Sequence, residues 1–104
     1  MNGNWLPAAR VAVSDRAHRW VRGTRGRLDV NLARARFVTN NHEKDWRPLA
    51  APTAVTLLPR HHADATVLRV ACGEDVAQFV VARPRVDVLL FLTTAVPAPL
   101  LQSI

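Results

Sequence analysis

The chain has 104 residues, of which 49% are apolar and 21% are charged, and its formal net charge is +6. This composition excludes a disordered chain and fits a single domain over residues 1–104. The longest apolar run, Val86 to Leu92, is too short to span a bilayer, and the single cysteine, Cys72, excludes an intramolecular disulfide. We therefore expect a reducing, cytoplasmic compartment, with organelle targeting as the alternative because the N-terminus is Arg-rich and poor in acids.

The net charge is confined to the first half of the chain. Residues 1–50 hold ten basic and four acidic groups, which gives +6, whereas residues 51–104 hold four of each, which gives zero. Between Arg10 and Arg36, eight arginines stand against two aspartates, which again gives +6. A GC-rich genome would explain the use of arginine in place of lysine, but not this clustering. The asymmetry predicts an anionic partner: nucleic acid first, an acidic protein or anionic membrane second.

The first predicted element is a short helix over Ser14–Val21. Ser14 can cap it, Asp15 suits its positive N-terminal end, and Gly23 is placed to end it. The next segment, residues 28–38, is ambiguous. As a strand, its alternation breaks midway, as a β-bulge would produce; as a helix, it is capped by an aspartate and has apolar residues at helical spacing. We prefer the strand because "RGRLDVNL" begins with regular alternation.

The second half begins with two predicted strands, Thr53–Leu58 and Thr66–Cys72, around a turn at "PRHHAD". Residues 75–83 have acids at the start and an arginine at the end, which favours a helix, while the valines leave a strand open as the alternative. Val86–Thr93 is almost continuously apolar, which is typical of a strand buried on both faces. If residues 75–83 form a helix, residues 66–93 make up a strand–helix–strand crossover.

The stretch "VACGEDVAQFVVARPRVDVLLFL" is loosely similar to the second strand, second helix and third strand of response-regulator receiver domains. Phe91 and Leu92 stand where a receiver has its phosphoacceptor aspartate, so this resemblance implies local structure and no activity. The predicted fold class is α+β. It consists of a short N-terminal helix followed by a small, mostly antiparallel sheet, with the crossover in residues 66–93.

The arginine cluster is the strongest candidate site. Arginine suits phosphate because its planar fork donates two parallel hydrogen bonds and stays protonated. The sequence has no zinc-finger spacing, aromatic RNA-binding signature or helix-turn-helix, so we expect binding without sequence specificity. Trp5 and Trp20 are candidates for stacking on bases of single strands; in the alternative, the cluster is a solvated face and Trp20 anchors the core. The predicted polyanion-binding residues are Arg10, Arg16, Arg19, Arg22, Arg25, Arg27, Arg34 and Arg36.

Other motifs favour structural roles. The segment "RHHAD" offers His61, His62 and Asp64 to a metal, with His42 as a further ligand, but adjacent histidines on a strand point to opposite faces. We expect a polar turn and no metal. We interpret Cys72 as a buried structural residue at the end of a core strand. There is no glycine-rich phosphate loop, nucleophile elbow or spaced pair of carboxylates, so we expect neither enzymatic activity nor a cofactor.

The C-terminal tail, "TTAVPAPLLQSI", is apolar and interrupted by two prolines. It must pack on the sheet edge or on a neighbouring subunit. Together with residues 86–92, it predicts a homo-oligomer or a place in a larger assembly. The predicted subunit-contact residues are Leu89, Phe91, Leu100, Leu101 and Ile104.

Three functions follow from these features. The preferred one is a small basic, non-enzymatic protein that contacts nucleic acid or another polyanion through its N-terminal half. The alternative is a structural subunit of a protein assembly, without nucleic-acid contact, whose arginines meet acidic protein surfaces. The third is a compact enzyme of nuclease or toxin type that uses "RHHAD". Salt separates the first two, because phosphate binding releases counterions and weakens steeply with ionic strength.

Overall fold

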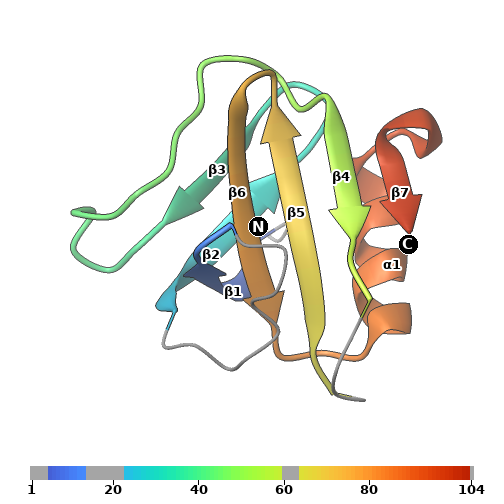
Figure 1. Cartoon of the computed structure of the whole chain (residues 1–104), viewed down its shortest axis with the longest axis horizontal. Coiled ribbons are helices and arrows are strands. Elements are labelled where there is room, and N and C mark those ends of the chain that lie inside the picture. Colours follow the sequence, from blue (N-terminus) through green and yellow to red (C-terminus); the bar gives the residue numbers. More distant parts are fainter. Residues whose placement is uncertain (1–4, 14–22, 60–63, 104) are drawn as a thin grey trace.

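The structure is a computed structural model that describes residues 5–13, 23–59 and 64–103. The described residues form one seven-stranded sheet in the order β3-β2-β1-β6-β5-β4-β7 (Figure 1). Neighbouring strands are antiparallel except β4 and β7, which are parallel, so the sheet is mixed. In chain order the elements are β1 (Leu6–Val11), β2 (Thr24–Val30), β3 (Ala35–Val38), β4 (Ala54–Leu57), β5 (Thr66–Cys72), β6 (Asp75–Val81), α1 (Arg85–Ala95), the 3-10 turn η1 (Ala98–Leu100) and β7 (Leu101–Ser103).

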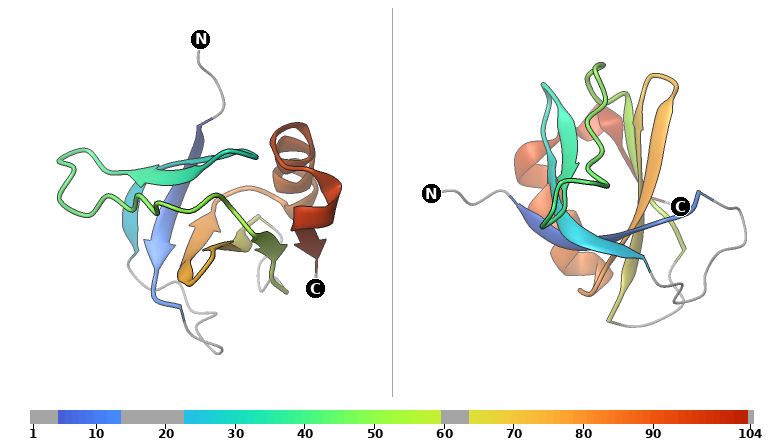
Figure 2. Two further views of the ribbon diagram at one scale, coloured as in Figure 1. Left: turned by 90° about the horizontal axis from the view of Figure 1, so that it is seen from above. Right: turned by 90° about the vertical axis from the view of Figure 1, so that its left-hand side faces the viewer.

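Strand β1 connects two parts of the sheet. Its residues 6–10 pair with β2, and its residues 9–11 pair with β6. We name β1, β2 and β3 the N-terminal arc, and β6, β5, β4 and β7 the C-terminal arc. The sheet bends at β1, so that β2 and β3 lie across from β5 and β6, as Figure 2 shows.

The core fills the space between the arcs. The ring of Phe79 in β6 lies 5.1 Å from that of Phe37 in β3 and 5.7 Å from that of Trp46, centroid to centroid. Gly26 permits this packing, because a Cβ on it would lie 2.7 Å from Cζ of Phe37 and would also clash with the carbonyl oxygen of Val38. The largest fully buried apolar side chains are Phe37, Phe79, Leu28, Leu57, Leu68, Leu92, Val30, Val55, Val70, Val81 and Val88.

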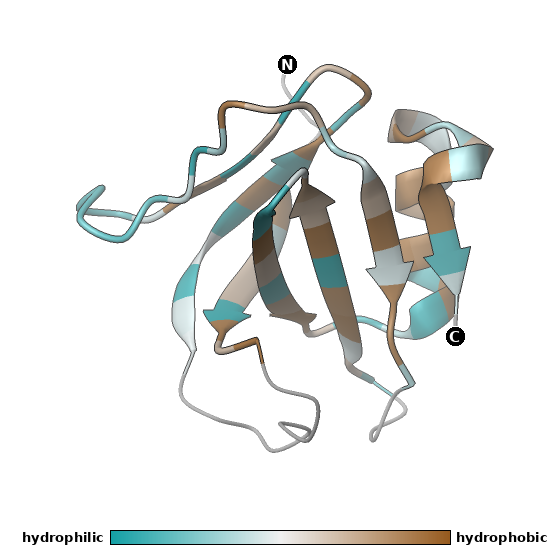
Figure 3. Ribbon diagram, turned by 45° about the horizontal axis from the view of Figure 1, so that its top comes forward, coloured by the Kyte–Doolittle hydropathy of each residue, from teal (hydrophilic) through white to brown (hydrophobic). Residues whose placement is uncertain are grey.

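Helix α1 closes the core beside β4 and β7. Val88 and Leu92 are buried at i and i+4, and Val96 continues the same face just beyond the helix. The guanidinium of Arg85 donates hydrogen bonds to the carbonyl oxygens of Leu57 and Leu58, which ties the first turn of the helix to the end of β4. Figure 3 shows the resulting division, with apolar residues on β4 to β6 and α1 and hydrophilic ones recurring along β2 and the loop after β3.

The predicted element order is wrong. The first element is a strand, β1, which begins at Leu6, so within the described residues no helix precedes the sheet. The residues predicted as that helix, 14–21, lie outside the described residues, as does the tail residue Ile104. The apolar residues of "WLPAARV" alternate inward on β1, where Leu6 is 2% and Ala8 9% exposed, and this short alternation was not recognised as a strand.

The crossover over residues 66–93 is also wrong, and with it the resemblance to receiver domains. β5 and β6 form an antiparallel hairpin with a two-residue turn, in which Gly73 adopts φ +65°. In β6, Ala77, Phe79 and Val81 all point inward, which is a strand period rather than a helical one.

The apolar run at 86–93 is helical rather than extended. It is continuous because α1 carries apolar residues on its exposed side as well as its buried side, a pattern that resembles two-sided strand burial in sequence. By contrast, the strands predicted at 53–58 and 66–72 are confirmed as the antiparallel pair β4 and β5.

Residues 28–38 are two strands separated by a turn, not one bulged strand or a helix. Oδ1 of Asn31 accepts hydrogen bonds from the backbone N–H groups of Ala33 and Arg34, at 2.8 and 3.0 Å, and so orders the turn. Val30 pairs with Ala35 across it. The alternation breaks at this point because the chain reverses direction there.

Candidate polyanion-binding surface

Three arginines lie on the outward side of the N-terminal arc. Leu28 and Val30 of β2 point into the core, so the alternation of the strand places Arg25 and Arg27 on the opposite face. Arg36 of β3 lies on that face too, paired with Asp29 in the β2–β3 register. We name the surface formed by Trp5, Arg25, Arg27 and Arg36 the basic face.

Trp5 lies between two of these arginines. The Cζ atoms of Arg27 and Arg36 lie 5.4 and 4.6 Å from the centroid of its indole ring, within the range of cation–π contacts. Trp5 immediately precedes β1, whose Pro7 pairs with Arg27, so the register of β1 and β2 brings the ring to the arginines. The sequence predicted Trp5 near the cluster, and the structure places it within the basic face.

The basic face has one acidic neighbour. Nε of Arg36 lies 3.2 Å from Oδ2 of Asp29, whose side chain is 10% exposed. Arg25 and Arg27 are exposed, and within the described residues neither forms an ion pair. Three arginines and one aspartate leave the face with a charge of +2, carried by the two arginines that lack an ionic partner.

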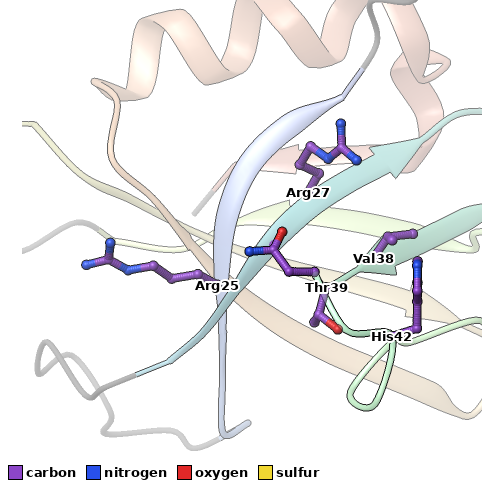
Figure 4. Close-up of a pocket in the computed structure, with 7 residues that line it drawn as sticks. Arg25, Arg27, Val38, Thr39 and His42 are labelled. Atoms are coloured by element: carbon purple, nitrogen blue, oxygen red, sulfur yellow. The ribbon is translucent and has the colours of Figure 1, made fainter.

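A shallow pocket of about 320 Å³ adjoins the basic face. It lies between β2 and the start of the loop after β3, and Figure 4 shows Arg25 and Arg27 directed apart at its rim. None of the described residues that line it is acidic. The residues around the pocket are Arg25, Gly26, Arg27, Val38, Thr39, Asn40 and His42.

A hydrogen-bond network around Asp45 holds the loop next to this pocket. Its Oδ1 accepts from the backbone N–H of Thr39 at 2.7 Å, and its Oδ2 lies 3.0 Å from both Nδ1 of His42 and Nη2 of Arg47. The hydrogen bond from Thr39, followed by those from His42 and Arg47, holds the pKa of Asp45 well below its ordinary value despite partial burial. No local pattern in the sequence marks Asp45, because its partners come from several positions of an irregular loop.

The two other predicted arginines that the structure describes do not lie on the basic face. Arg10 points to the inner side of β1, where its Cζ lies 6.0 Å from the ring centroid of Trp46. Arg34 is exposed in the β2–β3 turn. The structure therefore brings together three of the five predicted arginines that it describes. The other predicted residues of the cluster, Arg16, Arg19, Arg22 and Trp20, lie outside the described residues.

The other candidate motifs contribute no site within the described residues. Cys72 is 2% exposed at the end of β5, and burial, together with the charge of Asp75, raises the pKa of its thiol. In the part of the chain that the structure describes, no three His, Cys, Asp or Glu side chains are grouped to hold a metal ion. Of the "RHHAD" residues, His61 and His62 lie outside that part, and Asp64 is exposed.

The predicted subunit-contact residues differ in exposure. Leu89 is 37% exposed, whereas Phe91, Leu100 and Leu101 are half-buried and pack against the core. Val86 and Leu90 of α1 belong to the run that was predicted to be buried, but they are more exposed than any of these four residues. Among the described residues, no helix is long and apolar enough to cross a membrane.

No protein-family model matches the sequence, and comparison with curated proteins and with solved structures finds nothing similar.

Proposed function

We propose that the protein is a non-enzymatic nucleic-acid-binding protein that contacts the sugar–phosphate backbone through its basic face. This proposal rests on one observation: Arg25 and Arg27 are exposed on the same face of β2 and have no ionic partner among the described residues. They lie two residues apart along a strand, or about 7 Å, so their guanidinium groups can reach different phosphates.

The contacts of Trp5 favour a positioning role for its ring. A base that stacked on the indole would compete with the guanidinium groups of Arg27 and Arg36, which already lie over it. Trp5 therefore holds these two arginines against the sheet, and the arginines contact the phosphates. This proposal replaces base stacking as the principal role of Trp5.

The test is a titration of fluorescent oligonucleotides at several salt concentrations. The variant Arg25→Gln/Arg27→Gln removes both unpaired charges and buries nothing new, because both side chains are exposed. We expect it to weaken binding at least tenfold at about 50 mM salt, and to lower the slope of log Kd against log salt by about 1.4–1.8. All oligonucleotide sequences should be affected alike, since phosphate contacts carry no sequence information.

The matched control is Lys44→Gln/Arg83→Gln, which removes the same charge from exposed positions outside the basic face. Its affinity should fall less than about threefold, as expected for a weak long-range effect. Equal losses in the two variants would refute the assignment to the basic face. Absence of binding at low salt, together with salt-sensitive binding of polyglutamate, would instead support a subunit that meets acidic protein surfaces.

A further inference from the structure

The outer side of α1 exposes three apolar side chains, next to the exposed residues Asp87, Thr93 and Thr94. Val86 and Leu90 are 60% and 63% exposed, and Leu89 is 37% exposed. These residues are separated by three or four positions, or are adjacent, so they form one continuous strip on the helix. Asp87 is the exposed charged residue of α1 and borders this strip, whereas an ordinary surface helix would carry charged residues in place of Val86 and Leu90 as well.

A groove of about 220 Å³ runs beside this strip, between α1 and β7. Leu89 and Thr93 line it from the helix, and Leu101 and Gln102 line it from the strand. β7 is the last strand of the sheet, and among the described residues it pairs only with β4, so its other edge is open. The apolar strip, the groove and the open edge form one surface, which we name the C-terminal face.

The charge distribution indicates what can cover the C-terminal face. No charged residue is among the described residues that line the groove, although the guanidinium of Arg85 donates a hydrogen bond to Oγ of Ser103 in its lining. Residues 51–104 have no net charge, in contrast to the +6 of residues 1–50. Two copies of so basic a chain repel one another wherever their N-terminal halves meet. They can approach without this repulsion at the C-terminal face, which is also where apolar side chains are exposed.

We propose that the C-terminal face binds a second copy of this chain. The β7 edges pair antiparallel about a twofold axis that is perpendicular to the sheet, which places both α1 helices on the same side of the joined sheet. There, the Val86, Leu89 and Leu90 strips of the two copies meet. A three-residue edge is too short to hold two chains alone, so the helices supply most of the buried area.

The test is sedimentation velocity of the full chain over about 5–200 µM, the range in which a modest apolar interface is populated. We expect the wild-type chain to sediment at twice the chain mass. Leu90→Glu should raise the dimer dissociation constant at least about 100-fold, because it places a carboxylate in an apolar contact. The matched control is Leu32→Glu, since Leu32 is 62% exposed, almost the same as Leu90, but lies in the β2–β3 turn; this variant should remain dimeric.

Val86→Glu provides a second variant if Leu90→Glu does not fold, as judged by circular dichroism. A wild-type chain that is monomeric across the whole range would overturn the proposal, whether or not another protein or nucleic acid then binds it. A dimer that survives both Leu90→Glu and Val86→Glu, or one that Leu32→Glu also dissociates, would overturn it as well. The affinity of each chain for short oligonucleotides should be unchanged in Leu90→Glu, so the outcome is independent of the function proposed above.

Discussion

Arginines project from the outward sides of both arcs, but their surroundings differ. Arg27 in the N-terminal arc is exposed and forms no ion pair with a described residue. Arg69 in the C-terminal arc is half-buried, and its Nη2 donates a 3.3 Å hydrogen bond to Oε1 of Gln78, which is 1% exposed. The strand register continues this polar row through Thr56 to Gln102, where the Thr56 hydroxyl donates to the Gln102 amide oxygen. The guanidinium of Arg69 thus belongs to a hydrogen-bonded row of the sheet, with its Nε buried and without a hydrogen-bond partner among the described residues, whereas Arg27 is exposed to solvent.

Phe79 joins the two arcs, so its removal should have the largest effect on stability. Phe79→Ala removes the ring that contacts both Phe37 and Trp46, and should lower the free energy of unfolding by about 3–5 kcal/mol. Urea denaturation followed by tryptophan fluorescence and circular dichroism measures this loss. Phe91→Ala, on half-buried Phe91 of α1, is the control and should cost less than half as much. Two separate unfolding transitions would contradict a shared core.

Arg36 and Arg25 both lie on the basic face, but of these two only Arg36 forms an ion pair among the described residues. Arg36→Ala leaves the Asp29 carboxylate without its ionic partner at a site where the side chain is only 10% exposed, and should lower the free energy of unfolding by about 1–3 kcal/mol. Arg25→Ala should change it by less than about 0.5 kcal/mol, because Arg25 is exposed and unpaired within the described residues. Chemical denaturation of both variants measures this difference. Equal losses would show that the Arg36–Asp29 contact does not stabilise the arc.

Asp45 gives the smallest effect, and one that depends on pH. Asp45→Asn should lower the melting temperature by a few degrees at pH 7, because the carboxylate that accepts from Thr39, His42 and Arg47 is lost. The pKa of Asp45 is depressed by folding, so the ionised group stabilises above its unfolded pKa of 3.8, and this stabilisation is lost as the pH falls below that value.

Melting curves from pH 7 to the acidic limit of reversible unfolding should therefore show the gap between wild type and Asp45→Asn closing below about pH 4. Glu43→Gln is the control, since Glu43 is an exposed acid of the same loop and its side chain makes no ion pair among the described residues. A gap that is independent of pH would show that the network does not depend on the charge of Asp45.

Sequence patterns predicted some elements because their signals were local. The pair β4 and β5 follows from two β-rich runs bounded by proline and glycine. The helix α1 could not be predicted in this way, because its nearly continuous apolar run has neither a strand period nor a helical one. The helix buries Val88 and Leu92 at the end of the core, and this tertiary packing cannot be read from the local sequence.

The sequence predicts the positive charge of the candidate site, but it does not predict which arginines lie together. The clustering of arginines was visible in the sequence, but a turn at Asn31 and the register of three strands decide which of them share a face. Arg10, for example, belongs to the same cluster in sequence and yet lies over Trp46 on the inner side of its strand. The exposed strip of α1 was likewise only partly foreseen, since Val86 and Leu90 were expected to be buried.

The pairing of β1 with β6 of the C-terminal arc sets the order in which the sheet can be completed. The hairpins β2–β3 and β5–β6 close over a few residues, but Ala9 of β1 pairs with Val80, about 70 residues further along the chain, and such distant pairing slows folding. During synthesis the N-terminal arc is complete before β6 exists. Phe37 packs on Phe79 of β6, so this part of the core stays uncovered until β6 is made, and we expect the N-terminal arc not to be stable by itself.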